Sequence, residues 1–265
     1  MPKTAVITSD LHYGITSPRR VSSLKDEMMK AGPPDVVILA GDIGEPVPNF
    51  EGCIEVFSDL GCPVGVIIGN HDLYNTGSGC SSEELWSRVL HGVVRKYGLV
   101  WMEEETITVG RVAFVGSLTW YDYSSRSRRY ADLDEDFYQR HKARFVSDGK
   151  YIDWVRRDTD FARELLSGLV RRLERAEEDP HVERIVVVTH VPLFPEQMSH
   201  ERGDDPRADA YFGNFTAGMA VRRFSKVTDV VSGHTHRGVD TVKDGTRLVV
   251  VPSHYGRPAF VSLAF

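Results

Sequence analysis

Side chains that can bind a divalent metal ion gather in five short clusters along the chain. The clusters are Asp10-Leu11-His12, Gly41-Asp42, Gly69-Asn70-His71-Asp72, Thr189-His190 and Gly233-His234-Thr235-His236. Asp, Asn and His together form a ligand set suited to a hard-to-borderline divalent metal. The clusters therefore predict a metal site that is assembled from distant parts of the chain.

Each cluster follows a short apolar run rich in β-branched residues, and such runs predict buried strands. Ligands in open α/β sheets collect beyond the carboxyl ends of the strands, so the five clusters are expected to converge. Strands and helical patterns alternate over the first hundred residues, which favours parallel βαβ units. Antiparallel strands are expected in the second half, where Asp244-Gly245 predicts a hairpin. An apolar stripe predicts a long helix over 151–178.

The composition is that of an ordinary globular protein, with 41% hydrophobic and 26% charged residues in a chain of 265. A net charge of −6 argues against a protein that mainly coats nucleic acid. The three cysteines lack metal-ligand spacing, and free thiols in a reducing compartment are expected. The chain opens on a strand-like run without a signal-peptide pattern, and its apolar stretches are too short to span a bilayer. We therefore expect a cytoplasmic protein without membrane association.

In their order along the chain, the five clusters resemble the calcineurin-like metallophosphoesterase superfamily, whose pattern reads D-x-H, G-D, G-N-H-D/E, H and G-H-x-H. The matching elements run from residue 10 to residue 236. The resemblance implies an α/β fold: a four-layer α/β/β/α sandwich of two mixed sheets with helices on both outer faces. It also implies one domain over residues 1–265, of the bacterial, single-domain type, with the subfamily open.

The activity that the resemblance implies is dinuclear-metal-dependent hydrolysis of a phosphodiester or phosphomonoester. A hydroxide that bridges the two metals would attack phosphorus. The resemblance assigns the first metal to Asp10, His12, Asp42 and His236, and the second to Asp42, Asn70, His190 and His234. Residues two apart on an extended segment point the same way, which would pair Asp10 with His12 and His234 with His236. Manganese, iron and zinc all suit these ligands.

His71 is the one histidine of the motifs that the resemblance leaves off the metals, and it would protonate the leaving oxygen. Imidazole suits this role because its ordinary pKa lies near neutrality. Asp72 would either orient His71, as in a catalytic triad, or serve as a turn carboxylate. No Arg follows Asp42 or His71 closely, which disfavours a phosphoprotein phosphatase. Glu45, three residues after Asp42, is compatible with class III cyclic-nucleotide phosphodiesterases.

The substrate is expected to be a small phosphoester, with a nucleotide as one candidate. Residues 118–150 are polar and aromatic, and we expect them to form a cap insertion in which aromatic rings interleaved with Arg stack a base. Residues 191–215 are the second candidate wall. A nuclease acting on DNA or RNA is an alternative that ranks lower for an acidic chain. A non-catalytic scaffold of the same fold ranks lowest because the motif set is complete. The oligomeric state stays open.

Overall fold

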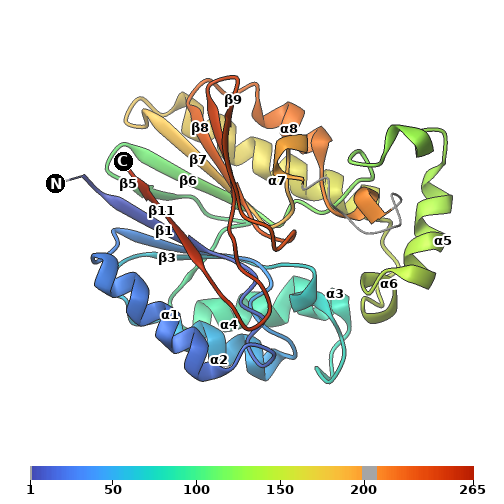
Figure 1. Ribbon diagram of the computed structural model, residues 1–265, viewed down its shortest axis with the longest axis horizontal. Coiled ribbons are helices and arrows are strands. Elements are labelled where there is room, and N and C mark those ends of the chain that lie inside the picture. The colour runs from blue at the N-terminus through green and yellow to red at the C-terminus, as the bar shows by residue number, and fades with distance from the viewer. Residues whose placement is uncertain (1, 199–207) are drawn as a thin grey trace.

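The protein folds as two mixed β-sheets packed face to face, with helices on both outer surfaces, as the resemblance predicts (Figure 1). The computed structural model describes residues 2–198 and 208–265. The helices beside the first sheet are α1 (Pro18–Ala31), α2 (Val47–Phe57) and α4 (Leu90–Lys96), and those beside the second are α7 (Asp158–Glu178) and α8 (Phe215–Val221). This arrangement explains the apolar strands, because both faces of each sheet are covered.

The first sheet carries the front half of the chain in the order β11-β1-β2-β3-β4. Its strands are β1 (Thr4–Thr8), β2 (Val36–Ala40), β3 (Val64–Ile67), β4 (Val100–Trp101) and β11 (Phe260–Ala264). β1 to β4 are parallel, as the strand–helix alternation predicts, and β11 pairs with β1 in the antiparallel sense. Every residue of β2 is buried, which accounts for its unbroken apolar sequence.

The second sheet has the order β5-β6-β7-β8-β10-β9. Its strands are β5 (Ile107–Val109), β6 (Val112–Ser117), β7 (Arg184–Thr189), β8 (Val227–Ser232), β9 (Val239–Lys243) and β10 (Thr246–Val250). Of the strands in the second half of the chain, β9 and β11 are antiparallel to their neighbours as expected, whereas β7, β8 and β10 also form parallel pairs within the sheet. The other edge strand, β5, is antiparallel to β6. The hairpin at Asp244-Gly245 is confirmed, with positive φ at both residues.

The helix predicted over 151–178 is wrong in its first turns, because α7 begins only at Asp158. Trp154 fits the apolar stripe by spacing, yet it lies in an irregular segment and packs its ring on Phe161 at 4.7 Å. The Asp153 carboxylate accepts a hydrogen bond from the Ser82 amide at 2.8 Å and holds this segment against α3 (Ser82–Glu84). A π-helical turn, Leu85–Val89, links α3 to α4.

Residues 118–150 leave the second sheet and form α5 (Glu135–Phe145) and α6 (Asp148–Tyr151) at one end of the molecule (Figure 1). The interpretation of their aromatic rings as a base-stacking surface is wrong for Trp120 and Tyr121, which are fully buried. Trp120 Nε1 donates to Asp158 at 2.7 Å, and Lys142 of α5 forms a 2.6 Å ion pair with the same carboxylate. These rings therefore fix the segment to the core.

The remaining elements are single turns in the loops around the sheet ends: η1 (His71–Leu73), η3 (Arg128–Tyr130), η4 (Pro195–Gln197) and η5 (Ala208–Tyr211). Across residues 2–198 and 208–265, no helix has both the length and the apolar character that crossing a membrane requires.

Candidate metal centre

The five predicted clusters follow the carboxyl ends of β1, β2 and β3 of the first sheet and of β7 and β8 of the second. They meet where the two sheets open toward α6, beside a pocket with a volume of about 340 Å³. The residues around the pocket are Asp42, Asn70, His71, Tyr74, Val146, Ser147, Asp148, Tyr211, Phe212, His234, Thr235, His236 and Tyr255. Residues far apart in the sequence are thus brought to one site by the strand order within each sheet and by the packing of the two sheets.

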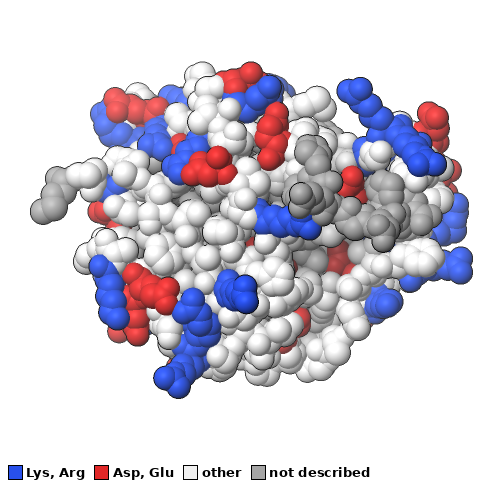
Figure 2. All heavy atoms as spheres, in the orientation of Figure 1, with Lys and Arg blue, Asp and Glu red and all other residues white. Residues whose placement is uncertain are grey.

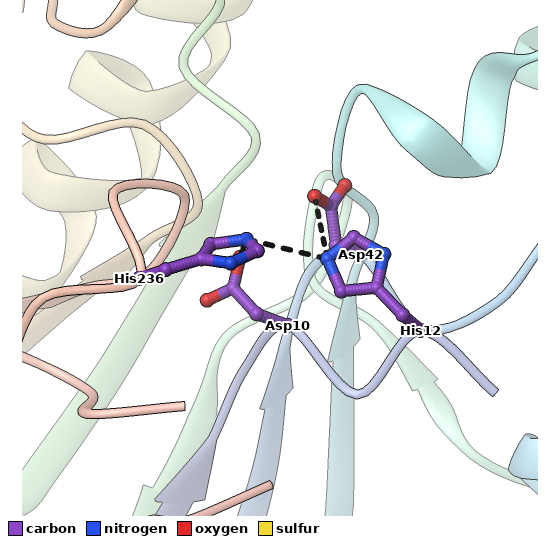
Figure 3. A group of neighbouring side chains, drawn as sticks. All are labelled: Asp10, His12, Asp42 and His236. Carbon is purple, nitrogen blue, oxygen red and sulfur yellow. Dashed lines mark hydrogen bonds and ion pairs between the residues drawn. The ribbon is translucent and has the colours of Figure 1, made fainter. Parts of the chain in front are cut away.

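The first ligand group consists of Asp10, His12, Asp42 and His236, whose candidate ligand atoms all lie within 4.8 Å of one another (Figure 3). His236 Nε2 lies 3.2 Å from Asp10 Oδ1 and 3.3 Å from His12 Nε2. His12 Nε2 lies 3.6 Å from Asp42 Oδ2. Two imidazole nitrogens that face each other beside two buried carboxylates suit a cation placed between them.

The second ligand group consists of Asp42, Asn70, His190 and His234. The candidate ligand atoms of Asp42, His190 and His234 again lie within 4.8 Å of one another. His190 Nε2 lies 3.3 Å from Asp42 Oδ1 and 3.1 Å from Asn70 Oδ1. This donor set of one carboxylate, one amide oxygen and two imidazoles also fits a divalent ion, and Asp42 belongs to both groups.

Backbone carbonyls hold the two histidines of the second ligand group from outside. His190 Nδ1 lies 3.0 Å from the Ala40 carbonyl oxygen, and His234 Nε2 lies 3.1 Å from that of Tyr211. A carbonyl only accepts, so each of these nitrogens carries the ring proton and donates. The other nitrogen of each ring is then unprotonated and is available to a metal.

Strained backbone is concentrated at the candidate ligands. Eight non-glycine residues in the described part of the chain have positive φ, and five of them are Asp10 (54°), His12 (43°), Asp42 (51°), His234 (67°) and His236 (58°). The expectation of extended backbone at Asp10 and His12 and at His234 and His236 is therefore wrong. Left-handed turns, not pleated strands, aim these side chains inward, and such conformations persist mostly at functional sites.

Two motif glycines are required by close packing between motifs. A Cβ on Gly69 would lie 2.1 Å from Asp42 Oδ1 and 2.7 Å from His190 Nε2. A Cβ on Gly233 would lie 1.8 Å from the Ser9 hydroxyl oxygen. Any side chain at either position would displace a candidate ligand or its neighbour, so these glycines let the loops approach one another.

His71 lies at the pocket beside the first ligand group, with its ring centroid 4.7 Å from that of His12. Its Nδ1 lies 3.3 Å from Glu45 Oε1, and the ring is still 19% exposed. A partly exposed imidazole held by a carboxylate on one nitrogen presents the other nitrogen to the pocket. The only signal in the sequence that marked Glu45 was its position three residues after Asp42.

Asp72 has a different place from the one expected of a residue that orients His71. Its oxygens accept from the amides of Ile43 at 2.8 Å, Gly44 at 2.9 Å and Gly69 at 2.7 Å. Of the two roles expected for Asp72, these contacts fit the turn carboxylate rather than the residue that orients His71. Asp72 is a turn carboxylate that ties the loop after β2 to the loop after β3.

Burial and charge set the protonation of the site. Burial lowers the pKa of His12 and of His234 to about 4, which keeps both rings neutral near pH 7. Burial alone would raise the pKa of Asp42, but the histidine rings around it, with His190 first and His71 next, together outweigh burial and hold that pKa below its usual range. Neutral imidazoles around an ionised carboxylate are the forms that bind metal. Burial also acts to lower the pKa of His71, but the Asp42 charge prevails and raises it to about 9.

Aromatic rings that sequence reasoning did not single out surround the site. Tyr255 packs on His12 with 4.4 Å between ring centroids, Tyr74 on His71 at 4.4 Å and Phe212 on His234 at 5.0 Å. No spacing or motif marks these rings in advance. The described residues that line the pocket include no Lys or Arg. Part of the predicted second wall, with His200, Arg202 and Arg207, lies outside the described residues.

The fold is an α/β sandwich whose two groups of candidate ligands could each hold a divalent ion. The family model described as calcineurin-like phosphoesterase matches residues 3–238, and the chain belongs to this family. A phosphopantetheinyl hydrolase from Mycobacterium tuberculosis has a similar structure, with a TM-score of 0.75 and 21% identity over 97% of this chain and 91% of that one. A dimetal phosphatase from Danio rerio is also similar, with a TM-score of 0.62 and 16% identity over 99% of this chain and 92% of that one. A search of curated protein sequences finds no match.

Proposed function

We propose that the protein is a dinuclear-metal-dependent phosphoester hydrolase. The observation that carries this proposal is the position of Asp42 between the two ligand groups. Its Oδ1 lies 3.3 Å from His190 Nε2, and its Oδ2 lies 3.6 Å from His12 Nε2. Each oxygen thus belongs to a different group, which supports a carboxylate that bridges two ions. Two ions held by these groups would clamp phosphate oxygens and lower the pKa of an attacking water.

The proposed ligands are those of the two groups: Asp10, His12, Asp42 and His236 for one ion, and Asp42, Asn70, His190 and His234 for the other. Manganese, iron and zinc all suit carboxylate, amide and imidazole donors. The neutral rings of His12 and His234 and an ionised Asp42 are already in the protonation states that bind metal.

His71 is the proposed general acid. Glu45 occupies its Nδ1 side at 3.3 Å and holds the ring, so Nε2 is free to donate a proton to the leaving oxygen. The Tyr74 ring packs on the His71 ring, with 4.4 Å between centroids, and this contact limits the motion of His71. Glu45 therefore takes the orienting part that was one of the two roles expected of Asp72.

The proposed substrate is a small phosphodiester with an apolar or aromatic group, and a nucleotide ester is one case. A diester carries one negative charge where a monoester carries up to two, and the described pocket wall offers aromatic rings but no Lys or Arg to balance a second charge. Val146, Ser147 and Asp148 line the pocket, which supports residues 118–150 as a substrate cap. The similar hydrolases support phosphoester chemistry without selecting a substrate.

Nucleic acid is a less favoured substrate. On the face seen in Figure 2, the described Lys and Arg side chains stand in separate groups, several of them beside Asp or Glu. Nucleic-acid binding relies on basic side chains that follow the phosphate backbone.

The cytoplasmic location expected from the unpaired cysteines also stays a prediction.

The direct test compares bis(p-nitrophenyl) phosphate with p-nitrophenyl phosphate on the manganese-loaded protein. We expect kcat/KM to favour the diester by about tenfold or more. A preference for the monoester would contradict the diester assignment and indicate a phosphatase. If two ions bind and neither ester is hydrolysed, nor any cyclic nucleotide, the scaffold alternative replaces the hydrolase.

A further inference from the structure

The cap segment places one buried carboxylate at the edge of the candidate metal centre. Asp148, the first residue of α6, is 3% exposed and lies at the pocket wall. Its Oδ1 accepts hydrogen bonds from Asn70 Nδ2 and from the Tyr74 hydroxyl, both at 2.8 Å. Its Oδ2 accepts from the Tyr121 hydroxyl, also at 2.8 Å. Asp148 is thus bound by three neutral donors, one of which is a candidate metal ligand.

The contact with Asn70 determines which end of that amide faces the metal. An ionised carboxylate only accepts hydrogen bonds, so the amide nitrogen of Asn70 must point toward Asp148. The amide oxygen then points the opposite way, toward His190 Nε2 at 3.1 Å. In the flipped orientation the Asn70 oxygen would face a carboxylate oxygen, and the second ligand group would present an NH₂ group, which does not bind a cation.

We propose that Asp148 is a positioning residue that fixes the amide oxygen of Asn70 for the second metal. This role rests on the proposed dinuclear function. The negative charge next to the amide nitrogen also draws electron density toward the amide oxygen and makes it a better ligand, as outer carboxylates do for metal-bound histidines.

The same carboxylate restrains the proposed acid. The Tyr74 hydroxyl shares Asp148 Oδ1, and the Tyr74 ring packs on His71 with centroids 4.4 Å apart and planes 32° apart. Asp148 is thereby joined directly to the proposed ligand Asn70 and, through Tyr74, to the proposed general acid His71. The position of α6 and the geometry of the metal centre are therefore linked.

The cap also supplies a matched control for the loss of a buried hydrogen bond. Tyr123 donates its hydroxyl to Asp158 within the same aromatic cluster, and it is absent from the pocket wall. Tyr123→Phe removes a tyrosine–carboxylate bond without touching either ligand group. It measures what destabilising the cap alone does to metal binding.

The experiment is a titration of metal-free protein with Mn²⁺. Binding is measured by calorimetry and by the electron paramagnetic resonance signal of free Mn²⁺. We expect two ions per wild-type chain. Asp148→Ala should weaken one of them by about 10–100-fold and leave the other unchanged. Asp148→Asn keeps an oxygen that can accept from Asn70, so its loss should be smaller. Tyr123→Phe should bind both ions as wild type does.

A double variant tests whether Asp148 acts through Asn70. If it does, Asn70→Ala/Asp148→Ala binds the ion of the second ligand group no worse than Asn70→Ala alone, whereas independent roles give additive losses. Additive losses, or equal weakening by Tyr123→Phe, would overturn the positioning role. Should Asp148→Ala not fold by circular dichroism, unchanged binding by Asp148→Asn overturns it instead.

The two proposals fail in different ways. A wild-type chain that binds fewer than two ions overturns the dinuclear function, and the role of Asp148 falls with it. A wild-type chain that binds two ions, with the same affinities in folded Asp148→Ala, overturns the role of Asp148 alone.

Discussion

The two ligand groups share Asp42 but differ in how the rest of the protein holds them. In the second group every other ligand has an outer partner: a backbone carbonyl for His190 and His234, and Asp148 for Asn70. In the first group His12 is buried, and its Nδ1 has no partner among the described residues. His236 is 15% exposed and borders Tyr255, which is itself 40% exposed.

This difference indicates that the second group is built in advance and the first is adjustable. Outer partners fix the tautomer and the direction of a ligand, and removing them typically weakens metal binding by about 10–100-fold. A fixed second site would hold its ion through the reaction cycle. A more open first site, next to His71, is better placed to exchange solvent and substrate atoms.

The largest effect is expected where the two groups meet. Asp42→Asn should remove most of both ions and lower kcat/KM by about a thousandfold or more, because metal-ion catalysis contributes several kcal/mol. Elemental analysis and turnover measure the two losses. The exposed Asp59→Asn is a charge-matched control that should change neither. An Asp42→Asn protein that retains two ions would show that the groups do not depend on a common carboxylate.

His71 belongs to neither group, so its loss should separate turnover from metal content. His71→Ala should keep both ions while kcat falls by about 10²–10⁴-fold, the range for general acid catalysis. The fall should be steepest for esters with poor leaving groups, which most need a proton. The exposed His181→Ala serves as the control. Metal depletion as severe as that of Asp42→Asn would contradict the assigned role and make His71 a ligand.

The smallest expected effect separates the two groups directly. Stepwise addition of a chelator should release the ion of the first group at a concentration about tenfold below that needed for the second. His236→Ala should abolish the early phase and His234→Ala the late one, both followed by metal analysis. Simultaneous release would show that the two groups bind equally tightly, and a late phase that depends on His236 would reverse the proposed order of affinity.

The candidate ligands could be predicted because each belongs to a local motif at the end of a strand. The position of Asp148 could not, since 78 residues separate it from Asn70 and its surroundings have no periodicity. Trp154 misled the helix prediction because aromatic packing can reproduce helical spacing without a helix. The sequence left two roles open for Asp72 for a related reason: a carboxylate next to a motif histidine can bind either the ring or the backbone, and sequence spacing does not distinguish the two.

The left-handed backbone at five ligands has a consequence for folding. Each such residue costs on the order of 1–3 kcal/mol, and in the absence of ions the packed sheets must offset that cost alone. Ions that bind only the folded chain return stability through mass action. The protein is therefore expected to tolerate destabilising core substitutions far from the site better when metal is plentiful. The supply of ions in the cell would then govern the amount of folded protein as well as its catalytic rate.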